Sequence, residues 1–376
     1  MNGLISTRVP RRAKHRRMAG VAILAAATSL VAVGCGSNST NNSAGKQSSA
    51  TTAGGSSATT AGSSSTSSGG THRASVSTKG WTFVDVPGIT TDAFYITLHN
   101  GAFQYAKSLG INLKYDGTAQ QGASPSVQVG IVHAVLSTKP KALIISPGNV
   151  TALIPPIQQF HSAGIPVVAV DTTINDPSLL VTQITSNNVQ GGALAAETIA
   201  KAHNYKGEVA VENVPPGVST TDARLAGFKA QLKKYPNMKI VAVENDQGEG
   251  TLAEAQSKSL ILSHPDLVGI FGTNLDGGQG AGDAVVADHD QGKITVVAYD
   301  AEPAEVQLLK QGVVSALIIQ QPTIEGQDAV KYAYDYLTGK KSEIPKKVLV
   351  PNVVATSKDA NDPNISKYFY SQNVTK

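Results

Sequence analysis

The stretch Val86-Pro-Gly-Ile-Thr-Thr-Asp-Ala-Phe-Tyr-Ile-Thr-Leu-His-Asn-Gly-Ala102 follows the apolar alternation Trp81-Thr-Phe-Val-Asp-Val86. Alternation with a period of two residues predicts a strand. Beyond the turn, Ile96, Phe103 and Leu109 keep roughly helical spacing and predict an amphipathic helix. A strand, a turn and a helix in this order form the repeating unit of an α/β sheet.

The predicted turn carries a carboxylate, Asp92, and two aromatic residues, Phe94 and Tyr95. In open α/β sheets, ligands bind at the carboxyl ends of the strands, where such turns lie. A carboxylate accepts two hydroxyl hydrogen bonds at once, and an aromatic ring covers the apolar face of a sugar. This combination is typical of carbohydrate binding, but the two aromatic residues can equally be the first core residues of the helix.

Strand-like and helix-like runs alternate along the rest of the chain. Leu153, Ile157 and Phe160, for example, form one apolar helix face. Such alternation predicts parallel sheets with helices on both faces, and about ten strands fit two doubly wound lobes better than one sheet. After the first strand, the predicted strands are Leu113–Tyr115, Ala142–Ile145, Val167–Val170, Val181–Ile184, Glu208–Val211, Lys239–Val243, Gly269–Phe271, Thr295–Ala298 and Ala316–Ile319.

Most of the predicted strands end in polar residues followed by a turn. One such end means little, because Asp and Asn are ordinary helix caps. Repetition of the pattern in both predicted lobes suggests one shared polar cleft. The polar ends include Asp171-Thr172, Asn274, Asp300 and Gln320.

The charge of the 376-residue chain is unevenly placed. The formal net charge is +4, but the first 34 residues hold six basic residues and no acidic one. The remainder has 25 basic against 27 acidic residues and is therefore slightly acidic. This balance gives no support for nucleic-acid binding.

Residues 1–34 have the parts of a secretory signal peptide, a basic segment followed by the apolar run Met18–Val33. The run ends in Ala32-Val33-Gly34-Cys35, which resembles a bacterial lipobox, although Leu is usual where Ala32 stands. Cys35 is the only cysteine and is predicted to carry a lipid that anchors the protein at the extracytoplasmic face of the cell membrane. The alternative is an ordinary signal peptide with an incidental cysteine.

Residues 35–75 begin with the predicted lipidated cysteine and are mostly Ser, Thr, Gly, Ala and Asn. They contain too little apolar surface to fold, because a packed core needs buried apolar side chains to offset the entropy of ordering. We therefore predict a disordered tether between the anchor and the folded body.

The body resembles periplasmic sugar-binding proteins of the ribose-binding type, the solute receptors of ABC importers. The resemblance covers roughly residues 80–350, and the order and spacing of several short motifs carry it. These motifs are Asp92-Ala-Phe-Tyr95 with Asn100-Gly-Ala102, Gly164-Ile-Pro-Val-Val-Ala-Val-Asp171, Ser186-Asn-Asn188 with Gly191-Gly192, Gly217 to Arg224 with Gly227-Phe228, Thr273-Asn274, Tyr299-Asp300 and Gln320-Gln-Pro322.

The resemblance implies two α/β lobes, doubly wound around parallel sheets, that are joined by a three-segment hinge and close on a ligand. The lobes would be residues 76–186 plus 322–344 and residues 187–321 plus 345–376. The crossing segments are expected near Thr185–Asn188, Gln320–Pro322 and Ile344–Lys347. It also implies a monomer that works with ABC permease subunits, without catalysis, cofactor or metal. The implied ligand contacts are Asp92, Phe94, Tyr95, Asp171, Asn274, Asp300 and Gln320.

The chain departs from the ribose-binding pattern at two further candidate contacts, Thr172 and Asp222, where the family has arginines. Arginine is the natural fork for neighbouring sugar hydroxyls, so ribose itself becomes doubtful as ligand and another sugar or a polyol is favoured. Three interpretations of Asp222 stay open. It can pair with Arg224, it can face a positively charged ligand such as an amino sugar, or it can point away and cap the following helix.

Two other functional classes fit parts of the sequence. Gly277-Gly-Gln-Gly-Ala-Gly282 suggests a dinucleotide enzyme, but Val285 stands where the last glycine of the phosphate-binding motif is needed. The eight histidines show no metal-ligand spacing. The other class is a sensor that passes an extracellular signal to a receptor instead of an importer.

Overall fold

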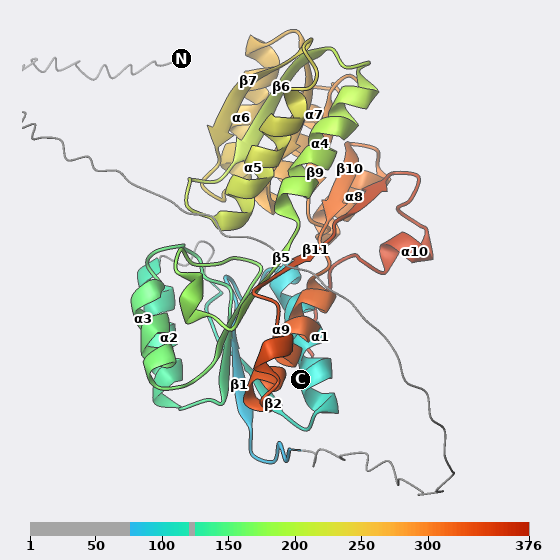
Figure 1. The fold of residues 1–376 in the computed structure, drawn as a ribbon. Helices are drawn as coiled ribbons and strands as arrows, with labels where there is room; N and C mark the ends of the chain where they lie inside the picture. The colour runs from blue at the N-terminus through green and yellow to red at the C-terminus, as the bar shows by residue number, and fades with distance from the viewer. Residues whose placement is uncertain (1–75, 120–124, 376) are drawn as a thin grey trace, which may run out of the picture. The chain divides into compact units, whose positions relative to one another are not determined.

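The structure, a computed structural model, describes residues 76–119 and 125–375 (Figure 1). The predicted signal peptide, the lipid on Cys35 and the tether lie outside these residues. Within the described ranges, none of the helices is both long enough and apolar enough to cross a membrane. These residues form two six-stranded sheets with helices on both faces.

The first sheet, called sheet A, is parallel throughout. Its strand order is β11-β5-β4-β3-β1-β2, so its last strand comes from a distant part of the chain. The strands are β1 (Thr82–Val86), β2 (Asn112–Tyr115), β3 (Ala142–Ile145), β4 (Val167–Val170), β5 (Thr182–Ser186) and β11 (Lys347–Val350).

Four α-helices cover sheet A. Helices α1 (Ala93–Ser108) and α9 (Pro322–Leu337) pack together on one face, and α2 (Pro125–Ser137) and α3 (Ile154–Ser162) lie on the other (Figure 1). Successive residues of a strand point to opposite faces, so neighbouring apolar residues of β1 enter different cores. Phe83 joins the core under α1 and α9, and Val84 joins the core under α2 and α3.

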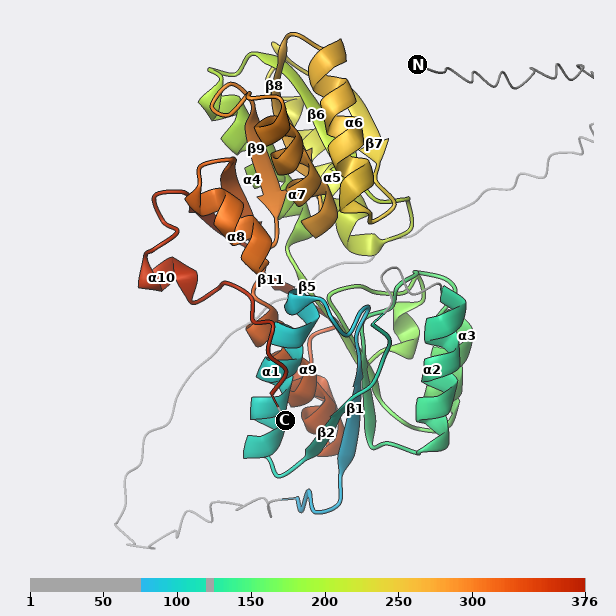
Figure 2. The same cartoon turned by 180° about the vertical axis from the view of Figure 1, so that it is seen from behind.

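The second sheet, called sheet B, has the order β12-β10-β9-β8-β6-β7 and one antiparallel edge strand, β12. Two helices, α4 and α5, cover one face, and three, α6 to α8, cover the face seen in Figure 2. The elements are α4 (Asn188–Ala202), β6 (Gly207–Asn213), α5 (Ser219–Leu232), β7 (Met238–Asn245), α6 (Gly250–Ser263), β8 (Leu267–Gly272), α7 (Leu275–Ala287), β9 (Thr295–Tyr299), α8 (Pro303–Lys310), β10 (Val314–Ile319) and β12 (Val353–Thr356).

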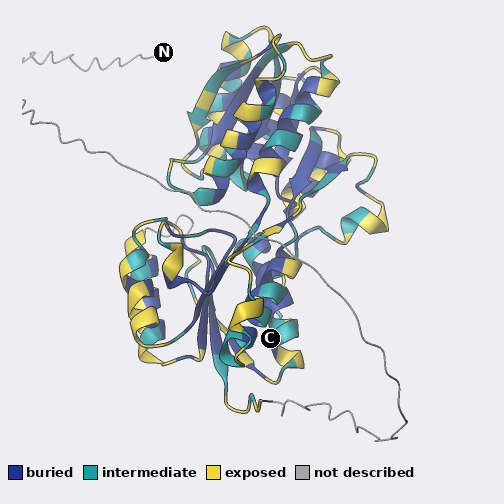
Figure 3. Ribbon diagram, viewed as in Figure 1, coloured by how far each residue is buried: buried dark blue, intermediate teal, exposed yellow. Residues whose placement is uncertain are grey.

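Three short helical turns complete the described elements. The 3-10 turns η1 (Pro177–Leu179) and η2 (Lys341–Glu343) precede edge-side strands of sheet A, and α10 (Pro363–Ser366) follows β12. The central strands of both sheets are buried, whereas exposed residues collect on the outer faces of the helices (Figure 3). Each sheet is therefore the middle layer of a three-layer sandwich.

The predicted fold class is confirmed, and every strand predicted from the sequence is present. The sequence missed β11 and β12, which are edge strands with mostly exposed or half-buried residues, whereas the equally short β3 and β4 are buried throughout and gave a clear apolar run. Their presence moves one boundary. Residues 347–350 pair with β5 in sheet A, so the chain leaves this sheet at Pro351-Asn352 and not at the predicted Ile344–Lys347. The prediction that residues 345–350 belong with sheet B is therefore corrected.

The close contact between α1 and α9 gives a test of the packing. A Cβ atom at Gly326 of α9 would meet the carbonyl oxygen of Leu98 at 2.0 Å. Gly326→Ala therefore forces the helices apart and should lower the free energy of unfolding by about 3 kcal/mol. Denaturant unfolding followed by circular dichroism measures the change.

The matched control is Gly130→Ala in α2, where a new Cβ would have no heavy atom within 4 Å. Alanine is the better helix former, so this variant should gain about 0.5–1 kcal/mol. Similar stability of the two variants would contradict the packing described for α1 and α9.

Candidate functional site

A cavity of about 620 Å³ lies at the carboxyl ends of strands from both sheets. It is lined by loops and helix starts that follow β1, β4, β8, β9 and β10. Parallel strands explain this convergence, because all their carboxyl ends lie at one edge of a sheet. Eight of the nine predicted ligand contacts line the cavity, namely Asp92, Phe94, Tyr95, Asp171, Thr172, Asn274, Asp300 and Gln320.

Asp92 is held at the start of α1. It is the N-cap residue, and its Oδ1 accepts a hydrogen bond from the backbone N–H of Phe94 at 2.8 Å. The same N–H also donates to Oε1 of Glu302 at 3.1 Å, so a carboxylate that follows β9 meets the first turn of α1. Burial raises the pKa of Asp92 well above its usual value, and the neighbouring Glu302 raises it further.

Phe94 and Tyr95 combine the two roles that the sequence left open. Phe94 is buried in the core, and its ring lies edge-on to Tyr95 with centroids 5.1 Å apart. Both residues also line the cavity. The Tyr95 hydroxyl donates a hydrogen bond to Oδ2 of Asp171 at 2.9 Å. The aromatic pair thus presents ring surface to the cavity and fixes one of its carboxylates.

Asp171 and Asp300 have left-handed backbone conformations, with φ angles of 64° and 91°. Each follows a central strand, and each N–H donates to the next strand of its sheet, at the carbonyl of Ile184 or of Ile318. Positive φ is costly for residues other than glycine, by about 1–2 kcal/mol. Such strain clusters at functional sites, so the backbone supports a binding role for both carboxylates.

Gln320 follows β10 and holds the Asp300 carboxylate from the side. Its Nε2 donates to Oδ1 of Asp300 at 2.5 Å. The Oε1 of Gln320 and the Oγ1 of Thr172 are buried and accept or donate no hydrogen bond within the described part of the chain. Buried polar atoms are costly when unpaired, so each side chain, which also lines the cavity, would gain a partner by turning toward the hydroxyl groups of a ligand.

The remaining two predicted contacts differ from each other. Asn274 lines the cavity and caps α7, where its Oδ1 accepts from the N–H of Gly277 at 3.3 Å. Asp222 is exposed and is absent from the residues that line the cavity. Its carboxylate accepts a hydrogen bond from the N–H of Gly217 at 2.9 Å, just before α5. Asp222 therefore points away from the cavity, as one of the three interpretations expected, but it does not cap the helix, because it lies in the first turn of α5 and the N-cap residue is Val218.

Arg224 is a cavity residue that the sequence analysis undervalued. It is only 3% exposed, its guanidinium lies 3.6 Å from the centroid of the Tyr299 ring, and its NH1 nitrogen is 4.0 Å from Oδ2 of Asp300. Its Nε and NH1 groups donate to Oδ1 of Asn188 and to the carbonyl of Thr273, both at 2.8 Å. Position on the inner face of α5 was the sequence signal that could have identified it.

Glu302 is a second cavity residue that the sequence analysis missed. It lies two residues after Asp300 and forms a capping box with Glu305 at the start of α8. Burial raises the pKa of both glutamates, and nearby carboxylates add to the effect. A glutamate before a proline is typical of a helix start, and this ordinary role concealed its place beside Asp92.

The glycine run that suggested a dinucleotide enzyme serves helix packing. A Cβ at Gly278 would meet that of Ala298 in β9 at 2.5 Å, and one at Gly280 would meet that of Ala253 in α6 at 2.6 Å. These glycines let α7 approach sheet B and α6 closely. Within the described ranges, no group of three His, Cys, Asp or Glu side chains is placed to hold a metal.

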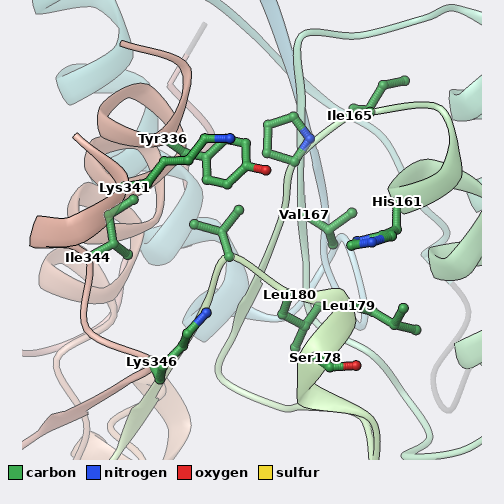
Figure 4. A pocket seen from close by; sticks show the side chains of 13 residues that line it. His161, Ile165, Val167, Ser178, Leu179, Leu180, Tyr336, Lys341, Ile344 and Lys346 are labelled. Atoms are coloured by element: carbon green, nitrogen blue, oxygen red, sulfur yellow. The ribbon is translucent and has the colours of Figure 1, made fainter. Parts of the chain in front are cut away.

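A second cavity, of about 350 Å³, lies at the amino ends of β4, β5 and β11 (Figure 4). Its lining is mixed, with aliphatic side chains such as those of Ile165 and Leu179 beside the polar ones of His161, Lys341 and Lys346. It contains none of the predicted ligand contacts. Because ligands of open α/β sheets bind at the opposite, carboxyl ends, the first cavity is the candidate site.

The sequence and the fold are similar to those of known proteins. A family model described as a periplasmic binding protein domain matches residues 83–341. A D-ribose/D-allose-binding protein of Pseudomonas aeruginosa is 30% identical over 69% of this chain and 83% of its own length. The ribose import binding protein of Bacillus subtilis is 28% identical over 70% of this chain and 84% of its own.

Solved structures are similar along nearly their whole length. An ABC transporter solute-binding protein from Agrobacterium vitis, bound with α-D-tagatopyranose, has 36% identity and a TM-score of 0.74, covering 77% of this chain and 99% of its own. A carbohydrate transporter solute-binding protein from Agrobacterium radiobacter, in complex with D-arabinose, has 27% identity and a TM-score of 0.72, covering 77% and 98%.

The electrostatics of the cavity predict a pH effect on stability. Burial raises the pKa of Asp171 from 3.8 to about 7, although Arg224 and Tyr95 oppose the rise. The unfolded chain loses this proton near its ordinary pKa, whereas the folded chain holds it to about pH 7. This group therefore stabilises the fold less and less as the pH rises between those values.

Asp171→Asn cannot ionise and tolerates positive φ, so it should remove this loss. The difference in free energy of unfolding between the variant and wild type should therefore increase from about pH 4.5 to about pH 8, by on the order of 1–3 kcal/mol in favour of the variant. Thermal unfolding at both pH values measures the gain, with the exposed Asp116→Asn as control. An unchanged pH dependence in Asp171→Asn would contradict the assignment.

Proposed function

The chain belongs to the periplasmic binding protein family, and from this premise we propose that it is an extracytoplasmic receptor for a neutral sugar or polyol. The family consists of solute-binding proteins, so the role of the chain is binding and not catalysis. It serves as the sugar-binding component of an ABC importer. The permease subunits of that importer would receive the ligand from the cleft between the lobes.

The convergence of acceptors and aromatic rings in one cavity carries this proposal. Asp92, Asp171 and Asp300 offer carboxylate oxygens to ligand hydroxyls, and Phe94 and Tyr95 offer ring surface to the apolar face of the ligand. Thr172, Asn274 and Gln320 add polar atoms around them. The cavity is large enough for a monosaccharide, and its lining supports this class of ligand without selecting one sugar.

The nature of the ligand follows from Arg224, the one arginine among the described residues that line the cavity. Arg224 already donates to Asn188 and to the backbone of Thr273, and a short hydroxyl side chain stands at Thr172. The relatives bind, by their names, D-tagatose, D-arabinose, D-ribose and D-allose. We propose a pentose or hexose for this chain, with ribose as the less favoured member, because Thr172 lines the cavity where the ribose pattern has an arginine fork. Position 222 gives no argument about the ligand, since Asp222 lies outside the cavity lining.

Ligand capture would use a hinge motion between two lobes built on sheets A and B. We propose that the lobes meet at the three places where the chain passes from one sheet to the other. These are the β5–α4, β10–α9 and β11–β12 connections. A monomer suffices for this motion, since both halves of the cavity belong to one chain.

Membrane attachment would come from a lipid on Cys35. The leader and the position of the only cysteine support this part of the proposal. An anchored receptor would stay at the membrane surface, close to the permease. The Ser/Thr/Gly-rich residues that follow Cys35 would give the body reach as a flexible linker.

Isothermal titration calorimetry with D-tagatose, D-arabinose, D-allose, D-ribose and D-apiose tests the binding class. In Asp300→Asn a charged acceptor of the cavity becomes a neutral one, and Asn still tolerates the positive φ at this position. We expect the affinity for the best sugar to fall by about tenfold or more, because a hydrogen bond to a charged group is worth about 1.5–3 kcal/mol.

Asp222→Asn is the matched control, since this carboxylate lies outside the cavity lining, and its affinity should equal that of wild type. Equal losses in the two variants, or chemical conversion of a bound sugar, would count against the proposal. Uptake of the labelled sugar in a strain without the gene separates import from signalling, because a sensor's loss leaves uptake unchanged.

The anchor has its own test. Cys35→Ser should move the protein from the membrane fraction to the soluble fraction or leave it unprocessed, because two acyl chains are needed for stable anchoring at about 0.8 kcal/mol per buried CH₂. Mass spectrometry of the mature wild-type chain should find a modified Cys35 at its N-terminus. An unmodified cysteine, or cleavage at another position, would refute the lipoprotein form.

A further inference from the structure

The C-terminal segment returns from sheet B to the helices of sheet A. After β12 and α10 the chain runs back along the molecule, and its end lies beside α1 in both views (Figures 1 and 2). The segment that makes this return is residues 370–375, called the strap from here on. It begins where the N–H of Tyr370 donates to the carbonyl of Ala301 at 3.1 Å.

The hydroxyl of Tyr370 reaches two candidate ligand contacts. It donates to Oδ1 of Asp300 at 3.1 Å, and it accepts from the backbone N–H of Gln320 at 3.1 Å. Tyr370 is 6% exposed, and burial together with Asp300 raises the pKa of its phenol well above the ordinary value. The phenol therefore keeps its proton and acts as a donor to the Asp300 carboxylate.

The ring of Tyr370 reaches a third candidate contact. Its centroid lies 5.7 Å from that of Phe94, with an angle of 68° between the planes, which is an edge-to-face arrangement. Phe94 and Tyr370 belong to one buried apolar cluster that contains residues of both sheets, such as Ile144 and Ile270. The strap thus continues the apolar core from one lobe into the other.

The rest of the strap is tied to α1. The N–H of Ser371 donates to Oγ1 of Thr97 at 2.7 Å. Asn100 binds the strap twice, because its Nδ2 donates to the carbonyl of Asn373 at 2.8 Å and its Oδ1 accepts from the N–H of Thr375 at 2.7 Å. Tyr370 is therefore bonded to the sheet B side, and the residues after it are bonded to the sheet A side.

We propose that the strap is a fourth connection between the lobes and that Tyr370 is a positioning residue of the ligand site, an inference that rests on the proposed function. Its hydroxyl turns Oδ1 of Asp300 away from the ligand and leaves Oδ2 for a sugar hydroxyl. Its ring supports Phe94 from behind. The turn between Tyr370 and Ser371 must deform whenever the lobes rotate, so the strap restrains opening and slows ligand release.

The competing interpretation is that Tyr370 only fills space in the core and does not influence the site. A role in packing alone would need the ring of Tyr370 but not its hydroxyl. Tyr370→Phe keeps the ring against Phe94 and removes only the hydroxyl. Tyr368→Phe, two residues earlier and partly exposed, is the matched control.

Calorimetry of the full chain with D-tagatose and D-arabinose tests the positioning role. We expect Tyr370→Phe to weaken binding by about tenfold, since a hydrogen bond to a charged acceptor is lost, and Tyr368→Phe to leave it unchanged. In an Asp300→Asn background the same change should add less than about twofold, because the carboxylate that Tyr370 orients is gone. Wild-type affinity in Tyr370→Phe, or fully additive losses, would overturn the positioning role.

Hydrogen exchange of the ligand-free full chain tests the strap independently of any sugar. Tyr370→Phe should speed exchange of the Gln320 amide, which loses its acceptor. Asn100→Ala should speed exchange of the amides of residues 371–375 and, if the strap restrains opening, also of residues that line the cavity. Asn112→Ala removes an exposed side chain of sheet A outside the strap and should change neither region.

Calorimetry and hydrogen exchange together distinguish failure of the strap proposal from failure of the proposed function. Faster exchange limited to residues 371–375 in Asn100→Ala would overturn the restraint on opening. If neither sugar binds the wild-type chain, the proposed function fails for these probes, and exchange still decides whether the strap couples to the cavity.

Discussion

The carboxylate of Asp300 joins parts of the chain that are far apart in sequence. It follows β9 in a strained backbone conformation, and it accepts hydrogen bonds from Gln320 after β10 and from Tyr370 near the C-terminus. Arg224 of α5 faces its other oxygen. A buried carboxylate needs such partners, because its desolvation would otherwise be costly. The arrangement of the sheet B side around the cavity follows from satisfying this one group.

Charge is the second constraint on the cavity. Five carboxyl groups line it, those of Asp92, Asp171, Asp276, Asp300 and Glu302, and the guanidinium of Arg224 lies near those of Asp171 and Asp300. Burial raises the pKa values of Asp92, Asp171 and Glu302, so protons take over part of the neutralisation that cations would otherwise supply. A cavity that neutralises itself in this way suits an uncharged ligand, whose hydroxyl groups pair with either form of a carboxyl group.

The fold was predictable because hydrophobic periodicity marks long buried strands well, and the carboxyl ends of those strands located most of the site. The edge strands β11 and β12 were missed, because their residues are mostly exposed or half-buried and form no fully buried apolar run like those of the equally short β3 and β4. Glu302 was hidden by its ordinary capping role, and Asp222 was included because spacing alone cannot tell an exposed helix residue from an inward one. Tyr370 was missed because its contacts depend on a tertiary return of the chain, which no local pattern encodes.

Asp171 and Asp300 occupy equivalent places in the two sheets. Strands β4 and β9 are each third in the strand order, and each aspartate N–H donates to the second strand, β5 or β10, on the side of the sheet edge. The two sheets thus repeat the same arrangement, a strained aspartate at the end of the third strand, and under the proposed function each sheet would contribute one carboxylate to the ligand. Departure of a sugar can then proceed in two stages. One carboxylate would release its hydroxyl groups as the cleft opens, while the other would still hold the sugar, already partly unbound, for transfer to the partner protein at the opening.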